Sequence, residues 1–99
     1  MAIRTINRDE LSREICKDTG CHKYVVDEVL SAFENNVKYY LSNGHRVRLS
    51  GFGTFLMQIR APRTGRNPHT GEAVPIPARY IPVFKPGDEL KRVSVKPVR

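Results

Sequence analysis

The longest regular pattern of apolar positions along the chain runs from His22 to about Asn43. Apolar side chains recur in this stretch at intervals of three and four residues, which is the spacing of one face of an α-helix. These side chains are Val25, Val26, Val29, Leu30, Phe33, Val37, Tyr40 and Leu41. Gly44 follows as a stop signal, because glycine readily takes the left-handed conformation that ends many helices. The pattern predicts a helix about 30 Å long.

A shorter helix is expected before this one. Asp9 is a candidate N-cap, Leu11 and Ile15 lie one helical turn apart, and Gly20 suits the C-terminal cap. The apolar stripe of the longer helix is wide for a chain of 99 residues. One short helix and a small sheet would leave part of it uncovered. A second copy of the chain would cover the stripe, and a monomeric core is the alternative.

The second half of the chain has the spacing of β-structure. Residues 46–50 alternate strictly, which predicts a strand with Val47 and Leu49 on the inner face. Two further strand-like runs cover Phe52–Ile59 and Ala73–Phe84. The second run contains prolines, which are tolerated only at the edge of a sheet. We therefore expect a three-stranded antiparallel sheet whose second and third strands extend into a two-stranded arm.

The tip of this arm would be the polar stretch Arg63–Gly71, with the sequence RTGRNPHTG. Pro68 is its one apolar residue. A two-stranded ribbon is marginally stable in water, and so polar a tip has no core to pack on. Such an arm is expected to gain its stability by meeting a partner. The arginines indicate that the partner is anionic.

The last element expected is a short helix after Phe84, with Asp88 and Glu89 in its first turn and with Leu90 and Val93 docked inward. The order of elements is thus α-α-β-β-β-α, which is typical of the α+β class. We expect one domain over residues 1–99. It would comprise a helical body at 6–44, a sheet and arm at 45–84 with the arm at about 58–79, and a C-terminal helix at about 86–95.

Charge is distributed unevenly along the chain, which has a net charge of +7. Residues 1–43 carry six Lys and Arg against seven Asp and Glu, whereas residues 44–99 carry eleven against three. A basic half beside a neutral half is typical of proteins that bind nucleic acid or a membrane surface. Charge that merely solubilises the protein is the alternative, although it needs no such segregation.

The residue types do not favour a membrane, metal or redox role. Met1–Thr5 is not followed by an apolar stretch, so we expect neither a signal peptide nor a membrane span, and a cytoplasmic location. Cys16, Cys21 and His22 lack the CxxC spacing and the fourth ligand of a metal site, and two cysteines do not make a disulfide framework. No cofactor is expected.

An enzyme is not expected either. The three acidic residues of the basic half are spread along it, and His69 has no acidic partner nearby in the sequence. A phosphate-binding P-loop is absent, because Glu72 follows Gly71 where that motif requires lysine. We therefore expect no catalytic residues and no small-molecule substrate.

Three segments together carry a resemblance to a known family. They are GFGTF at 51–55, RTGRNPHTG at 63–71 and FKPGDELK at 84–91. Their order and spacing resemble those of the bacterial histone-like family of HU and integration host factor, from about Asn7 onward. The resemblance implies an intertwined dimer, a homodimer or a heterodimer with a paralogue, with a saddle-shaped sheet. It also implies two arms that wrap double-stranded DNA through the minor groove, and a nucleoid location. In this family the proline at the arm tip, here Pro68, inserts between base pairs.

The candidate DNA-binding residues share a basic, polar or close-approach character. They are Arg60, Arg63, Thr64, Gly65, Arg66, Asn67, Pro68, Thr70, Arg79, Lys85, Lys91 and Arg8. Arg46 and Arg48 are equally compatible with a DNA contact and with a solvated face. Asp88 is acidic where many relatives carry lysine or a neutral residue, so no contact is assigned to it.

These observations favour a non-catalytic architectural protein that bends DNA with little sequence specificity and compacts or shapes the nucleoid. Weak specificity is expected because the minor groove distinguishes base pairs poorly. A site-specific DNA-bending module resembling integration host factor is one alternative, and an RNA-binding module is another. RNA binding would be favoured by exposed stacking aromatics. Phe52, Phe55 and Phe84 instead lie at expected core positions.

Overall fold

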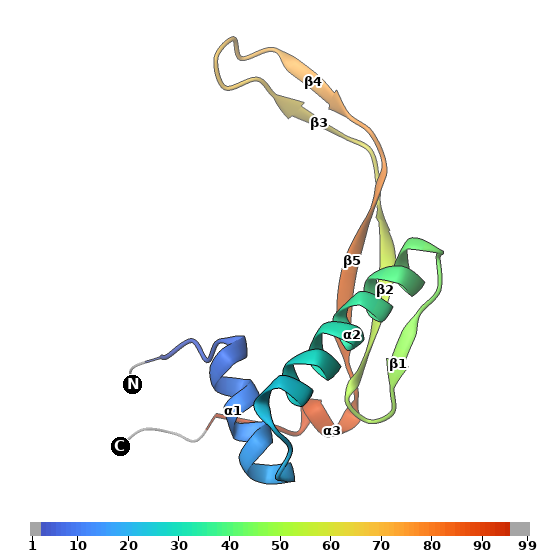
Figure 1. Cartoon of the computed structure of the whole chain (residues 1–99). Helices are drawn as coiled ribbons and strands as arrows, with labels where there is room; N and C mark the ends of the chain where they lie inside the picture. Colours follow the sequence, from blue (N-terminus) through green and yellow to red (C-terminus); the bar gives the residue numbers. More distant parts are fainter. Residues whose placement is uncertain (1–2, 96–99) are drawn as a thin grey trace. The chain divides into compact units, whose positions relative to one another are not determined.

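The computed structural model describes residues 3–95 (Figure 1). The elements in order are α1 (Arg8–Thr19), α2 (Lys23–Ser42), β1 (Val47–Leu49), β2 (Gly53–Arg60), β3 (Arg63–Arg66), β4 (Ala73–Ile76), β5 (Arg79–Pro86) and α3 (Asp88–Lys91). The chain divides into two compact units, one running to Tyr39 and the other comprising Tyr40–Ser94. No helix among the described residues is long and apolar enough to span a membrane.

The two long helices begin and end close to the predicted positions, with one correction. The N-cap of α1 is Asn7 and not Asp9, because the Asn7 side chain accepts a hydrogen bond of 2.9 Å from the backbone N–H of Glu10. Gly20 closes α1 with a φ of 75°, and its N–H donates to the Cys16 carbonyl at 2.8 Å. Gly44 follows α2 with a φ of 79°. Both glycine caps are therefore as predicted.

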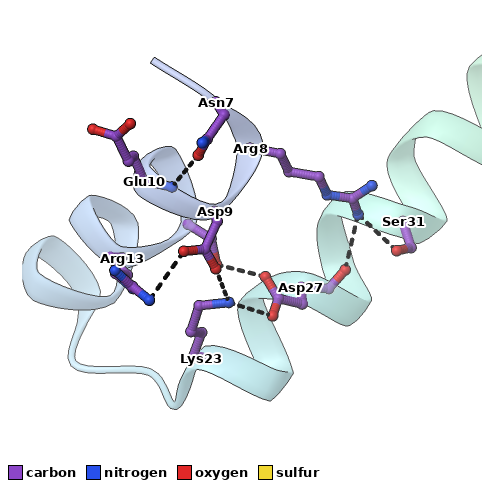
Figure 2. A network of polar contacts seen from close by, with 9 residues as sticks. Asn7, Arg8, Asp9, Glu10, Arg13, Lys23, Asp27 and Ser31 are labelled. Atoms are coloured by element: carbon purple, nitrogen blue, oxygen red, sulfur yellow. Dashed lines mark hydrogen bonds and ion pairs between the residues drawn. The ribbon is translucent and has the colours of Figure 1, made fainter. Parts of the chain in front are cut away.

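A polar network joins α1 to α2 (Figure 2). Asp9, which does not cap α1, takes part in it through ion pairs. Lys23 Nζ lies 2.8 Å from Asp9 Oδ1 and 2.9 Å from Asp27 Oδ2. Arg13 reaches Asp9 Oδ2 at 3.0 Å. The hydroxyl of Ser12, a residue with 0% exposure, donates to Asp27 Oδ1 at 2.6 Å.

The apolar stripe of α2 is only partly covered in the single chain. Among residues 3–95, Val26 is the one large apolar residue that is buried, with 6% exposure. Val29 is 61% exposed, and Leu11 of α1 is 49% exposed. The monomeric core considered as an alternative is therefore not formed by this chain alone.

The aromatic cluster of the second unit is also partly open. Phe84 contacts Phe55 and Phe52, with ring centroids 4.8 and 5.7 Å apart. Phe52 is nevertheless 49% exposed and Phe84 36% exposed. Phe52 and Phe84 are therefore not buried within one chain, as core positions would require, whereas Phe55 is half-buried.

The sheet has the predicted antiparallel order, β1-β2-β5. Gly53 in β2 lets the Phe84 ring lie directly against the backbone. Gly53 is buried, and a Cβ at this position would overlap the Phe84 ring. The Gly87 N–H donates to the Phe52 carbonyl at 2.7 Å, and the Glu89 N–H donates to the Gly51 carbonyl at 3.1 Å. These two hydrogen bonds hold the start of α3 against the turn that precedes β2.

The C-terminal helix is shorter than the predicted 86–95. α3 covers Asp88–Lys91 and its C-cap is Arg92. The β-branched residues Val93 and Val95 then favour extended backbone over helix. Val93 is 72% exposed, so within this chain it does not dock inward as expected, whereas Leu90 is half-buried.

The arm also differs from two unbroken strands. The β2–β5 ladder ends at the pair Arg60↔Arg79, and a separate β3–β4 ladder begins at Arg63↔Ile76. The break contains Pro62 on one side and Pro77 on the other. Because proline has no backbone N–H, neither residue can donate to the ladder at this point.

The polar network predicts how acid affects stability. The pKa of Asp27 lies below its ordinary 3.8, first because the Ser12 hydroxyl donates to its carboxylate and then because Lys23 does. A hydrogen bond from Lys23 lowers the pKa of Asp9 in the same way. Groups with a lowered folded-state pKa stabilise the fold above the unfolded value, and this contribution is lost as pH falls through 3.8 towards the folded pKa.

We expect Ser12→Ala to raise the pKa of Asp27 towards 3.8, since the largest cause of its lowering is removed. Acid unfolding should then occur at a higher pH than in the parent. NMR titration of the Asp27 carboxyl carbon measures the pKa, and circular dichroism measures unfolding. Lys17→Ala is the control, because it breaks the exposed Lys17–Glu14 pair outside the network. Identical Asp27 titrations in parent and Ser12→Ala would contradict the assignment.

Candidate nucleic-acid interface

The loop between β3 and β4 forms the tip of the arm (Figure 1), and Asn67 makes three of the hydrogen bonds that close it. The Asn67 N–H donates to the Glu72 carbonyl at 2.9 Å, and the Asn67 carbonyl accepts from the Gly71 N–H at 2.8 Å. The Asn67 side-chain oxygen accepts from the His69 N–H at 2.8 Å. Gly71 has a φ of 75°, which glycine adopts without strain. The tip therefore has a defined conformation without an apolar core.

Other predicted site residues also shape this tip. Arg66 Nη1 donates to the Gly71 carbonyl at 3.0 Å, and the Thr70 hydroxyl accepts from the Glu72 N–H at 3.3 Å. Pro68 is exposed between the half-buried Asn67 and the exposed His69. The tip thus presents the rigid apolar ring of Pro68 to solvent, while the Arg66 guanidinium is bonded to the Gly71 carbonyl at the other end of the loop. The sequence pattern NPxTG was the signal for this shape, although the individual bonds could not be read from it.

Gly65 and Thr64 lie in the paired part of the arm. Thr64 pairs with Pro75, and Gly65 pairs with Val74. A Cβ at Gly65 would lie 2.8 Å from Ile76 Cδ1, so the missing side chain lets Ile76 cover the backbone of the ribbon. Ile76 is half-buried as a result. This contact gives the arm a small apolar element of its own.

Three basic residues lie on or beside the three-stranded sheet β1-β2-β5, which we call the body sheet. Arg46, Arg48 and Lys85 line a hollow of about 320 Å³, together with Thr54 and the acidic Asp88. Arg48 pairs with Thr54, and Thr54 pairs with Lys85, so the two basic side chains flank one threonine across the strands. The sequence predicts Lys85 as a DNA contact, and it is equally compatible with a DNA contact and a solvated face for Arg46 and Arg48. Their strict alternation with Val47 and Leu49 was the signal that placed them on one face.

A second hollow lies between the body sheet and the β3–β4 ladder, and three exposed arginines line it: Arg60, Arg63 and Arg79. Lys91 is exposed in the last turn of α3. Its role as a nucleic-acid contact stays a prediction, as do the roles of the other candidate DNA-binding residues.

Arg8 belongs to the other unit and has partners within it. Its guanidinium donates to Ser31 Oγ at 2.7 Å and to the Asp27 carbonyl at 3.3 Å (Figure 2). It also lies 2.7 Å from Glu34 Oε1. A role for Arg8 in binding an external anion would require it to exchange these partners. Within residues 3–95, no group of three or more His, Cys, Asp and Glu side chains is placed to hold a metal ion.

The geometry of the tip yields a test that needs no ligand. We expect Asn67→Ala to loosen the loop, because the His69 N–H loses its acceptor. Asn67→Asp is the matched control, since it keeps an oxygen acceptor at the same position. Amide ¹⁵N relaxation of residues 67–72 should show lower order parameters in Asn67→Ala than in Asn67→Asp and the parent. An unchanged tip in Asn67→Ala would show that the side-chain bond is unimportant.

Comparison with known proteins agrees with this arrangement. A family model described as bacterial DNA-binding protein matches residues 6–94. The chain is 40% identical over 86 residues to integration host factor subunit alpha of Shewanella loihica, covering 87% of this chain and 88% of that protein. It is 44% identical over 85 residues to the DNA-binding protein HU of Lactococcus lactis, covering 86% and 93%. An HU–DNA cocrystal structure from Anabaena matches with a TM-score of 0.82 and 35% identity, covering 86% of this chain and 92% of that one. The chain therefore belongs to the bacterial DNA-binding protein family of HU and integration host factor.

Proposed function

We propose that the protein is a non-catalytic architectural protein that binds and bends double-stranded DNA through the minor groove. The observation that carries this proposal is the closed arm tip, which exposes Pro68 two residues after Arg66 on a basic ribbon. The family relationship supports the same partner, because one structural relative was crystallised with DNA. The protein would act in the cytoplasm of a bacterium, where it compacts or shapes the nucleoid.

The arm would contribute to DNA binding in two ways, by neutralising phosphates and by inserting Pro68 at a base step. Arg63, Arg66 and Arg79 would neutralise phosphates and release counterions, which gives affinity that falls with salt. Pro68 would press on a base step and partly unstack it, at a cost on the order of a few kcal/mol that the additional wrapped contacts offset. Proline suits this task, because its rigid ring leaves no N–H donor unpaired against the base pairs.

Little sequence specificity is expected of this mechanism. Most of the proposed contacts reach phosphates, and the minor-groove floor mainly distinguishes A·T from G·C. Arg46, Arg48 and Lys85 around the hollow of the body sheet would add further phosphate contacts. A preference for bent or nicked duplexes is expected instead, since a deformable site lowers the cost of the kink.

We further infer that the working form is a dimer, either of this chain or with a paralogue. The large apolar side chains left exposed on one chain support this inference, because buried apolar area is the main source of stability for a domain this small. Residues 1–99 would then be one family domain per protomer.

The dimer proposal predicts that the melting temperature rises with protein concentration, since association stabilises the folded form by mass action. Val29→Lys should abolish this dependence and lower the mass measured by light scattering, because Val29 belongs to the exposed stripe. Asn35→Lys adds the same charge to an exposed polar position of α2 and is the control. A monomeric mass for the parent at micromolar concentration would exclude the dimer.

The DNA-bending proposal predicts that substitutions of two residues of the tip, Arg66 and Pro68, affect affinity and bending differently. Arg66→Ala should weaken binding to all duplexes and reduce the slope of log K against log salt by about one. Pro68→Ala should leave that slope nearly unchanged and reduce the bend angle. The loss of affinity in Pro68→Ala should be smallest on nicked DNA, where the kink is already cheap.

Fluorescence energy transfer between duplex ends measures the bend, and titrations at several salt concentrations measure the slope. If Pro68→Ala bends DNA as strongly as the parent does, Pro68 only forms the turn. Duplex RNA of equal length is the comparison ligand. Binding to RNA that is tighter than binding to DNA would favour the RNA-binding alternative.

A further inference from the structure

The hollow of the body sheet has an acidic residue among its basic ones. Its lining includes three bases and one acid, which are Arg46, Arg48, Lys85 and Asp88. All four residues are exposed. The formal charge of the lining is therefore +2, because one negative charge offsets one of three positive charges. The acid is the unexpected member of this set, since the three bases suit an anionic partner.

The backbone fixes the place of Asp88 at this hollow. The residue before it, Gly87, donates its N–H to the Phe52 carbonyl at 2.7 Å, and the residue after it, Glu89, donates to the Gly51 carbonyl at 3.1 Å. A Cβ at Gly87 would lie only 2.5 Å from the Gly51 carbonyl oxygen, so the two segments are in close contact. Asp88 is thus held on both sides, beside the bases of the hollow.

The carboxylate of Asp88 is not used in an ion pair. Within residues 3–95, ion pairs join other residues, and none of them includes Asp88 or one of the three bases of the hollow. The negative charge is therefore not neutralised by a partner, and it acts on any anion that approaches the bases. A nearby like charge opposes the binding of that anion, and salt screens the effect because these groups are exposed.

Stabilisation of α3 is the other role that an acid has at this position. Asp88 and Glu89 both lie in the first turn of α3, where a negative charge interacts favourably with the helix dipole. Glu89 provides such a charge without lining the hollow. The dipole therefore does not by itself require an acid among the bases.

We propose that Asp88 sets the affinity of the body sheet for DNA. Its carboxylate opposes the phosphate group that the three bases would bind, and it thereby limits how tightly the body holds any duplex. This inference rests on the proposed function, because the ligand is a phosphate of the DNA backbone. Phosphate contacts carry no sequence information. Weakening them at the body leaves a larger share of the affinity to the arm, and so to the ease with which the duplex bends.

The test compares Asp88→Asn with the parent in binding to one linear duplex, measured by fluorescence anisotropy at several salt concentrations. Asp88→Asn should bind about fivefold more tightly at low salt, as expected for the loss of one nearby like charge in water. The gain should shrink as salt rises, so the slope of log K against log salt should steepen by up to about one. Asp88→Lys should move both quantities further in the same direction.

Two control variants raise the net charge by the same amount as Asp88→Asn. Glu89→Gln removes the other acid from the first turn of α3, and Asp18→Asn removes an exposed acid from α1. Neither residue lines the hollow, so both variants should bind far more like the parent than Asp88→Asn does. Thermal unfolding of each variant, followed by circular dichroism, measures any change in the stability of the fold separately.

The inference is overturned if Asp88→Asn binds no more tightly than its controls at any salt concentration. Weaker binding by Asp88→Asn together with a lower Tm would also overturn it and would leave Asp88 only its role in α3. In both cases, binding of the duplex by the parent would keep the proposed function intact. A parent that binds no duplex would overturn the proposed function as well.

Discussion

The arm of this protein has to hold its shape without a hydrophobic core beneath it. The two strands keep one register from the body sheet through the proline-containing break to the tip. This register sets which side chains face each other, and so it brings Arg60 opposite Arg79 and places Asn67 where its backbone can close the loop with Gly71 and Glu72. The presentation of Pro68 depends on all of these pairings, because no packed layer corrects an error in them.

The helical unit also has little buried apolar packing, and polar side chains form part of the contact between α1 and α2. Ser12 and Asp27 occupy the place between α1 and α2 where a larger domain would bury aliphatic side chains, and Lys23 links Asp27 to Asp9. Polar pairs of this kind specify one helix pairing, although partly exposed ion pairs contribute little to stability. Val29 on the apolar face of α2 is exposed in the single chain, and the proposed dimer would cover it.

Much of the fold could be predicted because the responsible signals are local. The spacing of apolar residues, together with the glycines and prolines between elements, located both helices and the strands. The left-handed glycines Gly20 and Gly44 were identified from their positions at the helix ends. Predictions that depended on competition between neighbours were less successful. Asn7 rather than Asp9 caps α1, because Asp9 is drawn into ion pairs with Arg13 and Lys23 across the helices. The last helix ends early at Lys91 for the local reason that β-branched residues follow.

The sequence by itself determined the basic half of the chain, the polar arm and the exposed proline at its tip, since these follow from residue type and spacing. Only the tertiary structure decided which charges act together. Arg60, Arg63 and Arg79 are dispersed in the chain, yet strand pairing collects them at one hollow, and Arg48 joins Lys85 across the sheet in the same manner. The physical reason is that cross-strand neighbours are set by register, a long-range property that no local pattern of residues contains.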